Sequence, residues 1–72
     1  MDQIENLTIK EIFILAVKNQ QEGKTDIALK FYNQVIKIDP NYSQAHNNLG
    51  IIFKTLGENQ KAMDYLKKSN QD

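Results

Sequence analysis

Residues able to carry out chemistry are few in this chain of 72 residues. His46 is the only histidine and cysteine is absent, so a metal site or a Cys–His pair would lack the converging groups that it requires. Ser43 and Ser69 are the only serines, and neither lies in a nucleophile elbow or beside a plausible base. We therefore expect no enzyme, no catalytic residue, no metal and no cofactor, and we interpret His46 as a partly buried packing residue.

The charged residues argue against nucleic acid and membrane as partners. Nine lysines balance nine acidic residues, so a broad electrostatic field is not expected. Arginine is absent, and with it the planar fork that recognises phosphate groups and guanine edges. Lys67 and Lys68 are interpreted as favourable charge on the last turn of a helix. We expect a protein or peptide partner.

The apolar segments are short. The longest run extends from Ile12 to Val17, six residues, against the roughly 20 that a membrane-spanning helix needs. The first eight residues carry two acids and no basic group, unlike a secretory or mitochondrial leader. These features predict a cytoplasmic protein that does not enter a membrane.

A repeat with a period of 34 residues runs through the chain. Gly23 and Gly57 are 34 residues apart, and each supplies the left-handed conformation that commonly ends a helix. The same offset relates Ala28 to Ala62 and Leu15 to Leu49. The sequence therefore predicts the same helical unit twice.

Helical spacing of apolar residues places the first pair of helices. Thr8 and Glu11 form a capping box, and Gly23 ends the first helix, which gives residues 9–22. Thr25 is a plausible cap for the second helix. That helix must stop before Pro40, because proline disfavours a helical conformation in the residue before it.

The pattern then recurs, and strand signals are absent. A third helix is expected near residues 43–56 and a fourth near residues 59–69. Gly50 lies inside the third helix, where glycine costs about 1 kcal/mol relative to alanine. Close packing of another helix is the expected reason for this glycine.

At this point the pattern resembles the tetratricopeptide repeat. In the second unit the matching residues are Leu49, Gly50, Phe53, Gly57, Ala62 and Leu66, and in the first they are Leu15, Ala16, Gly23, Ala28, Tyr32 and the turn from Asp39 to Asn41. The chain departs from the signature at Asn19, where a large aromatic residue is usual, and at Ile12 and His46, where an early aromatic is frequent.

The resemblance implies an all-α fold. Two tandem helix-turn-helix repeats would form four antiparallel helices and a short right-handed superhelical segment. Residues 1–8 would be a leader and helix cap, residues 9–42 the first repeat, and residues 43–72 a second repeat that is truncated at its end.

The resemblance also implies that a peptide or protein binds on a concave face, lined mainly by the first helix of each unit. The expected partner-binding residues are Lys10, Phe13, Val17, Gln20, Gln44, Asn47, Asn48, Ile51 and Lys54. Some family members clamp acidic chaperone tails, but only Asn48 matches that clamp, since Phe13 and Val17 occupy the first-unit clamp positions. A partly apolar groove is therefore expected.

Two alternatives remain open for the apolar faces. The fourth helix has no predicted successor to cover it, so Met63, Tyr65 and Leu66 are candidates for self-association into a homo-oligomer. The chain could instead be a fragment of a longer array of repeats, because at least three repeats are usually needed for stability.

Overall fold

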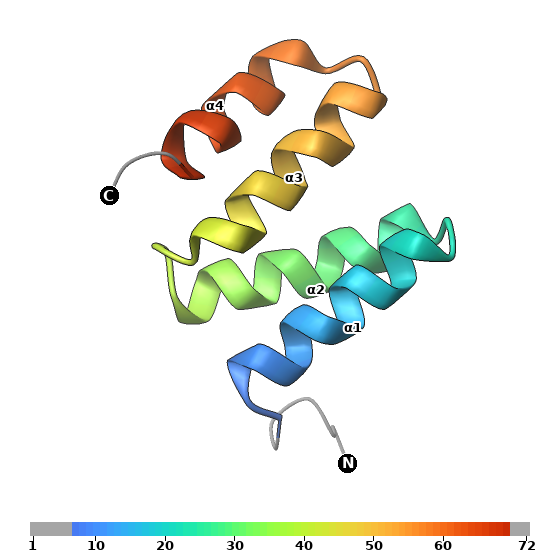
Figure 1. Ribbon diagram of the computed structural model, residues 1–72, viewed down its shortest axis with the longest axis vertical. Coiled ribbons are helices and arrows are strands. Elements are labelled where there is room, and N and C mark those ends of the chain that lie inside the picture. The colour runs from blue at the N-terminus through green and yellow to red at the C-terminus, as the bar shows by residue number, and fades with distance from the viewer. Residues whose placement is uncertain (1–6, 70–72) are drawn as a thin grey trace.

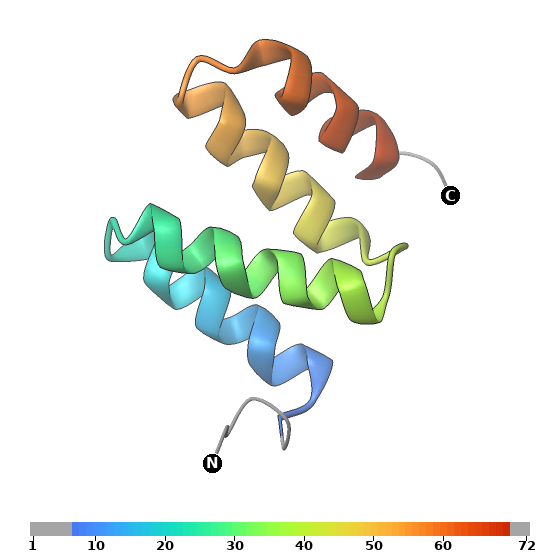
Figure 2. The ribbon, with the colours of Figure 1, turned by 180° about the vertical axis from the view of Figure 1, so that it is seen from behind.

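The computed structural model describes residues 7–69, which form four helices and no strand. The helices are α1 (Ile9–Gln21), α2 (Thr25–Ile38), α3 (Ser43–Thr55) and α4 (Asn59–Ser69). Figure 1 shows two helical hairpins, α1 with α2 and α3 with α4, and Figure 2 shows the same order from behind, with α2 between α1 and α3. The expectation of an all-α fold built from two helix-turn-helix units is confirmed.

The predicted capping box begins α1. The Glu11 backbone N–H donates to Thr8 Oγ1 over 3.1 Å, and the Thr8 N–H donates to Glu11 Oε1 over 2.8 Å. These two bonds satisfy amide groups that have no acceptor within the helix. The local sequence alone therefore fixes the start of this helix.

The connection between α1 and α2 differs from the prediction in one respect. Gly23 has the expected positive φ of 79°, but Thr25 is not the cap, because Lys24 occupies that position and makes no capping bond through its side chain. The Lys24 N–H reaches the Asn19 carbonyl at 2.9 Å, and the Lys24 carbonyl accepts the Ala28 N–H at 3.0 Å. The helix therefore starts one residue earlier than a threonine cap would allow.

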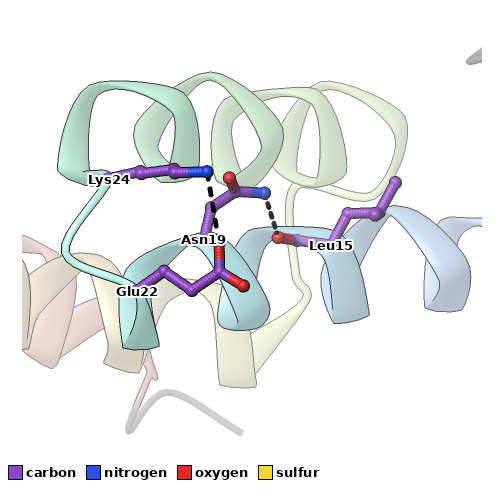
Figure 3. A network of polar contacts seen from close by, with 4 residues as sticks. All are labelled: Leu15, Asn19, Glu22 and Lys24. Atoms are coloured by element: carbon purple, nitrogen blue, oxygen red, sulfur yellow. Dashed lines mark hydrogen bonds and ion pairs between the residues drawn. The ribbon is translucent and has the colours of Figure 1, made fainter.

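Asn19 makes a local contact where the repeat signature has a large aromatic residue. Its side-chain Nδ2 donates to the Leu15 carbonyl at 2.8 Å, one turn earlier in α1 (Figure 3). Nearby, Lys24 and Glu22 form an exposed ion pair at 3.4 Å across the turn. Both contacts belong to the first hairpin, and an exposed pair of this kind contributes little to stability.

The turn predicted around Pro40 lies between α2 and α3. The Asp39 carboxylate accepts the Asn41 N–H at 3.0 Å, and the Asp39 carbonyl accepts the Tyr42 N–H at 3.1 Å. An Asp side chain that bonds the backbone two residues later mimics a tight turn. The chain thus reverses between Ile38 and Ser43.

Small residues let the helices approach closely. Ala16, Ala28 and Ala45 are fully buried, and Gly50 faces α4 so closely that a Cβ atom there would lie 2.7 Å from Leu66 Cγ and 3.2 Å from the Ala62 carbonyl oxygen. The expectation that Gly50 allows close packing is confirmed. The largest fully buried side chains are Tyr32, Ile12, Leu49 and Val35.

Replacing Gly50 by alanine should destabilise the fold. A Gly→Ala change inside a helix normally gains about 1 kcal/mol, but here the added methyl group must displace Leu66, and overpacking costs about 1–3 kcal/mol. The difference between the two effects predicts that the free energy of unfolding in urea falls by up to about 2 kcal/mol. Asn47→Ala, at an exposed site on the same helix, should change it by less than about 0.5 kcal/mol. A stabilised Gly50→Ala variant would contradict the close approach of α3 and α4.

Candidate functional site

An open hollow of about 440 Å³ lies beside α3. Phe13 of α1 bounds it on one side and Ser69 of α4 on another. The α3 side chains that line it are Ser43, Gln44, Asn47 and Asn48. The fold therefore brings together, from two helices that are far apart in the sequence, four of the residues expected to bind a partner: Phe13, Gln44, Asn47 and Asn48.

Two tyrosines hold the Phe13 ring. The Tyr32 ring from α2 lies edge-on to it, with ring centres 5.9 Å apart, and the Tyr42 ring from the turn before α3 is tilted against it at 5.3 Å. Such arrangements of aromatic rings are favourable beyond the area that they bury. Phe13 is half-buried, so one part of its ring anchors it to the fold while the other part borders the hollow.

A chain of hydrogen bonds through Tyr32 links three helices behind the hollow. The Tyr32 hydroxyl donates to Gln20 Oε1 of α1, and Asn48 Nδ2 of α3 donates to the Tyr32 oxygen over 3.1 Å. Burial raises the pKa of Tyr32 above its ordinary value of 10.0, and the bond from Asn48 partly opposes this shift. The amide of Asn48 is thereby held in one orientation at the edge of the hollow.

This chain of bonds changes the interpretation of Gln20. The sequence places Gln20 on the partner-binding face, and that role stays a prediction; in the structure the residue is half-buried, and its side-chain oxygen accepts the Tyr32 hydroxyl. Nothing in the linear sequence signals the contact, because Gln20 and Tyr32 are 12 residues apart and meet only through packing of α1 on α2. Tyr32 itself was recognisable only as a core aromatic.

The side chains around the hollow are neutral. Amides, hydroxyls and one aromatic ring line it, and none of the lining residues is acidic or basic. Gln44, Asn47 and Asn48 follow the i, i+3, i+4 spacing that places side chains on one face of a helix. An amide group offers both donors and an acceptor, so this face can bond the backbone of an extended or helical chain.

The other expected binding residues lie outside this hollow. Lys10, Ile51 and Lys54 are exposed and Val17 is half-buried, but none of them lines it. Their place on a wider binding surface stays a prediction.

His46 lies deeper than the sequence suggested. Its side chain is 6% exposed rather than partly buried, with Nε2 2.7 Å from the Pro40 carbonyl oxygen and its ring centre 5.8 Å from that of Tyr65. Between residues 7 and 69, no group of three or more His, Cys, Asp or Glu side chains could hold a metal ion. The geometry gives His46 a packing role.

The three candidate self-association residues differ in exposure. Met63 is 55% exposed, whereas Tyr65 and Leu66 are half-buried. The Tyr65 ring stacks on Phe53 at 5.5 Å, and Leu66 packs across Gly50. Substituting Tyr65 or Leu66 would therefore perturb the fold itself, and Met63 is the residue through which this surface can be tested.

The comparisons with known proteins identify one family. A family model described as TPR repeat matches residues 21–57, which span α2, the Pro40 turn and α3. The search of curated proteins and the search of solved structures each found no match. None of the helices within residues 7–69 combines the length and the apolar character needed to cross a membrane.

The raised pKa of Tyr32 predicts a loss of stability in alkali. Because the folded state favours the protonated phenol, this contribution is complete below pH 10 and decreases as the pH rises through the higher folded-state pKa. The free energy of unfolding, measured in urea at a series of alkaline pH values, should fall accordingly. Tyr32→Phe should reduce that slope, and should cost about 1 kcal/mol at neutral pH through the lost hydrogen bonds. The control Tyr42→Phe, which keeps Tyr32, should show the same dependence of the unfolding free energy on pH as the unaltered chain. If Tyr32→Phe also shows that dependence unchanged, Tyr32 is not the residue that causes it.

Proposed function

This chain belongs to the tetratricopeptide repeat family, and from that premise we propose that it is a protein-interaction module that holds a peptide segment in the hollow beside α3. Members of this family are generally protein–protein interaction modules built on a non-catalytic scaffold.

The observation that carries the proposal is the composition of the hollow. Phe13 offers an apolar face held in place by two tyrosine rings, and α3 offers a row of amides opposite it. Peptide-binding surfaces commonly combine side-chain pockets for specificity with polar groups that bond the peptide backbone. Both parts are present here on rigid helices.

The segment that fits best is uncharged where it meets the hollow. Lysine side chains do not line it, so a strongly acidic tail would lose its hydration without gaining an ion pair. In such a complex, an apolar or aromatic side chain of the peptide would pack on Phe13, and neighbouring backbone groups of the peptide would form hydrogen bonds with the amides of Asn47 and Asn48. Val17 and Ile51 would extend the apolar contact along α1 and α3.

Hydrolysis is a weaker alternative for the same hollow. Ser43 and Ser69 line it, but no histidine, aspartate, glutamate or lysine does. A serine hydroxyl needs an adjacent base to become a nucleophile. The lining residues therefore support binding and offer no proton acceptor for catalysis.

Selection from a displayed library of random peptides tests this function. The chain should enrich sequences that share an apolar anchor and carry little charge around it, and their affinity should change little with salt concentration. Enrichment of acidic sequences with strongly salt-dependent binding would contradict the proposed site.

A matched pair of variants locates the site. Asn47→Lys should weaken binding of the selected peptide at least about tenfold, because it places a charge in the neutral hollow. Asn33→Lys makes the same change at an exposed position on α2 and should bind like the unaltered chain. Titrations followed by peptide fluorescence anisotropy give the affinities, and circular dichroism checks that both variants keep their helicity. Equal affinities for the two variants would exclude the hollow as the binding site.

A further inference from the structure

The two hydrogen bonds of Tyr32 have a fixed direction. A phenol hydroxyl has one hydrogen, which Tyr32 donates to Gln20 Oε1 of α1. Toward α3 the same hydroxyl oxygen can then only accept a hydrogen bond, and Asn48 supplies it through Nδ2 over 3.1 Å. The acceptor on Gln20 therefore decides which end of the Asn48 amide faces Tyr32.

Asn48 carries this direction to the hollow beside α3. Three amides line the hollow, and two of them, Gln44 and Asn47, are exposed. Of the three, Asn48 alone has a hydrogen bond to another side chain within residues 7–69. Gln44 and Asn47 can therefore turn either end of the amide toward a ligand, whereas Asn48, whose nitrogen is held by Tyr32, has its oxygen Oδ1 at the free end.

This direction has a consequence for the kind of peptide that the hollow accepts. On the basis of the peptide-binding function proposed above, we propose that Gln20 determines the specificity of the hollow through Tyr32, so that a bound peptide must place a hydrogen-bond donor, such as a backbone N–H, against Asn48 Oδ1. A carbonyl or carboxylate oxygen there would meet a second acceptor and lose its bonds to water without replacement. Gln20 does not line the hollow and is a positioning residue.

The burial of Tyr32 makes its partners decisive. The residue has no exposed surface, so its hydroxyl relies on Gln20 and Asn48 and not on bulk water. If Gln20 lost its oxygen, the hydroxyl would turn its hydrogen toward Asn48, and the amide would turn over to accept it with Oδ1. Nδ2 would then be the free end, and the hollow would favour an acceptor in the peptide.

Nuclear magnetic resonance of the free chain tests the direction without any peptide. The Asn48 side-chain NH₂ group should show nuclear Overhauser contacts with the Tyr32 ring hydrogens next to the hydroxyl. In Gln20→Met these contacts should weaken, because the amide turns over. In Gln20→Glu, which keeps an acceptor at the same place, they should persist. Contacts of equal strength in Gln20→Met and in the unaltered chain would overturn the proposal.

Replacement of single peptide N–H groups tests the specificity itself. The probe is the tightest peptide from the displayed library, resynthesised with one backbone amide at a time changed to an ester, which removes the donor. At one position the ester should weaken binding to the unaltered chain and to Gln20→Glu about tenfold, but weaken binding to Gln20→Met by less than about twofold. The control Gln21→Met makes the same change at an exposed position of α1 and should behave like the unaltered chain.

Loss of this specificity can be told apart from loss of peptide binding. If the library yields no peptide, or if Asn47→Lys leaves its binding unchanged, the hollow does not bind peptides and the role of Gln20 fails with it. If a peptide binds in the hollow but no ester effect depends on Gln20, the peptide-binding function stands and the role of Gln20 alone is wrong. If Gln20→Glu loses the ester effect as fully as Gln20→Met, the residue acts through packing and not through its acceptor, which also contradicts the proposal.

Discussion

The buried phenol of Tyr32 stands where α1, α2 and α3 meet, with no exposed surface and with its hydroxyl bonded to Gln20 on one side and Asn48 on the other. A buried hydroxyl that loses its partners costs about 1–3 kcal/mol, a large share of the stability of so small a domain. The three helices are therefore constrained to the one arrangement that satisfies it. The position of Phe13, which packs against the Tyr32 ring, follows from this arrangement.

Different packing contacts hold each of the two hairpins and the junction between them. Within the second hairpin, Gly50 lets α4 approach so closely that Leu66 occupies the space of a side chain. Within the first, fully buried alanines allow α1 and α2 to pack. The junction of α2 with α3 combines a buried aliphatic cluster with the Tyr32 hydrogen bonds, and it is this junction that brings Phe13 and the amides of α3 to the same hollow.

Local chemistry made part of this fold predictable from the sequence. Three features depend only on a few neighbouring residues or on the helical period, so they could be predicted from the sequence. They are the capping box of Thr8 and Glu11, the left-handed conformation of Gly23 and Gly57, and the close approach of α4 at Gly50. The cap before α2 could not be predicted in this way, because Lys24 takes that position without a capping bond from its side chain, whereas local preference favoured Thr25.

The candidate site was predictable only in part. Phe13, Gln44, Asn47 and Asn48 were expected to share a face and do line one hollow, because helical spacing fixes which side chains of a helix point together. The hydrogen bond between Gln20 and Tyr32 depends on how α1 packs on α2, and the inward packing of Tyr65 and Leu66 depends on how α4 packs on α3. Such relations between helices are set by packing in three dimensions and leave no local pattern in the sequence.

The two hairpins form one structural unit whose geometry is fixed by the hydrogen bonds of Tyr32. Native-state hydrogen exchange measures this most directly, since it reports the free energy at which each segment opens. The most protected amides of α2 and of α3 should share one opening free energy, equal to that of global unfolding, and Tyr32→Phe should lower both together. If α3 and α4 exchange at a distinctly lower free energy than α1 and α2, the hairpins open independently, and Tyr32 does not hold the hollow in a fixed shape.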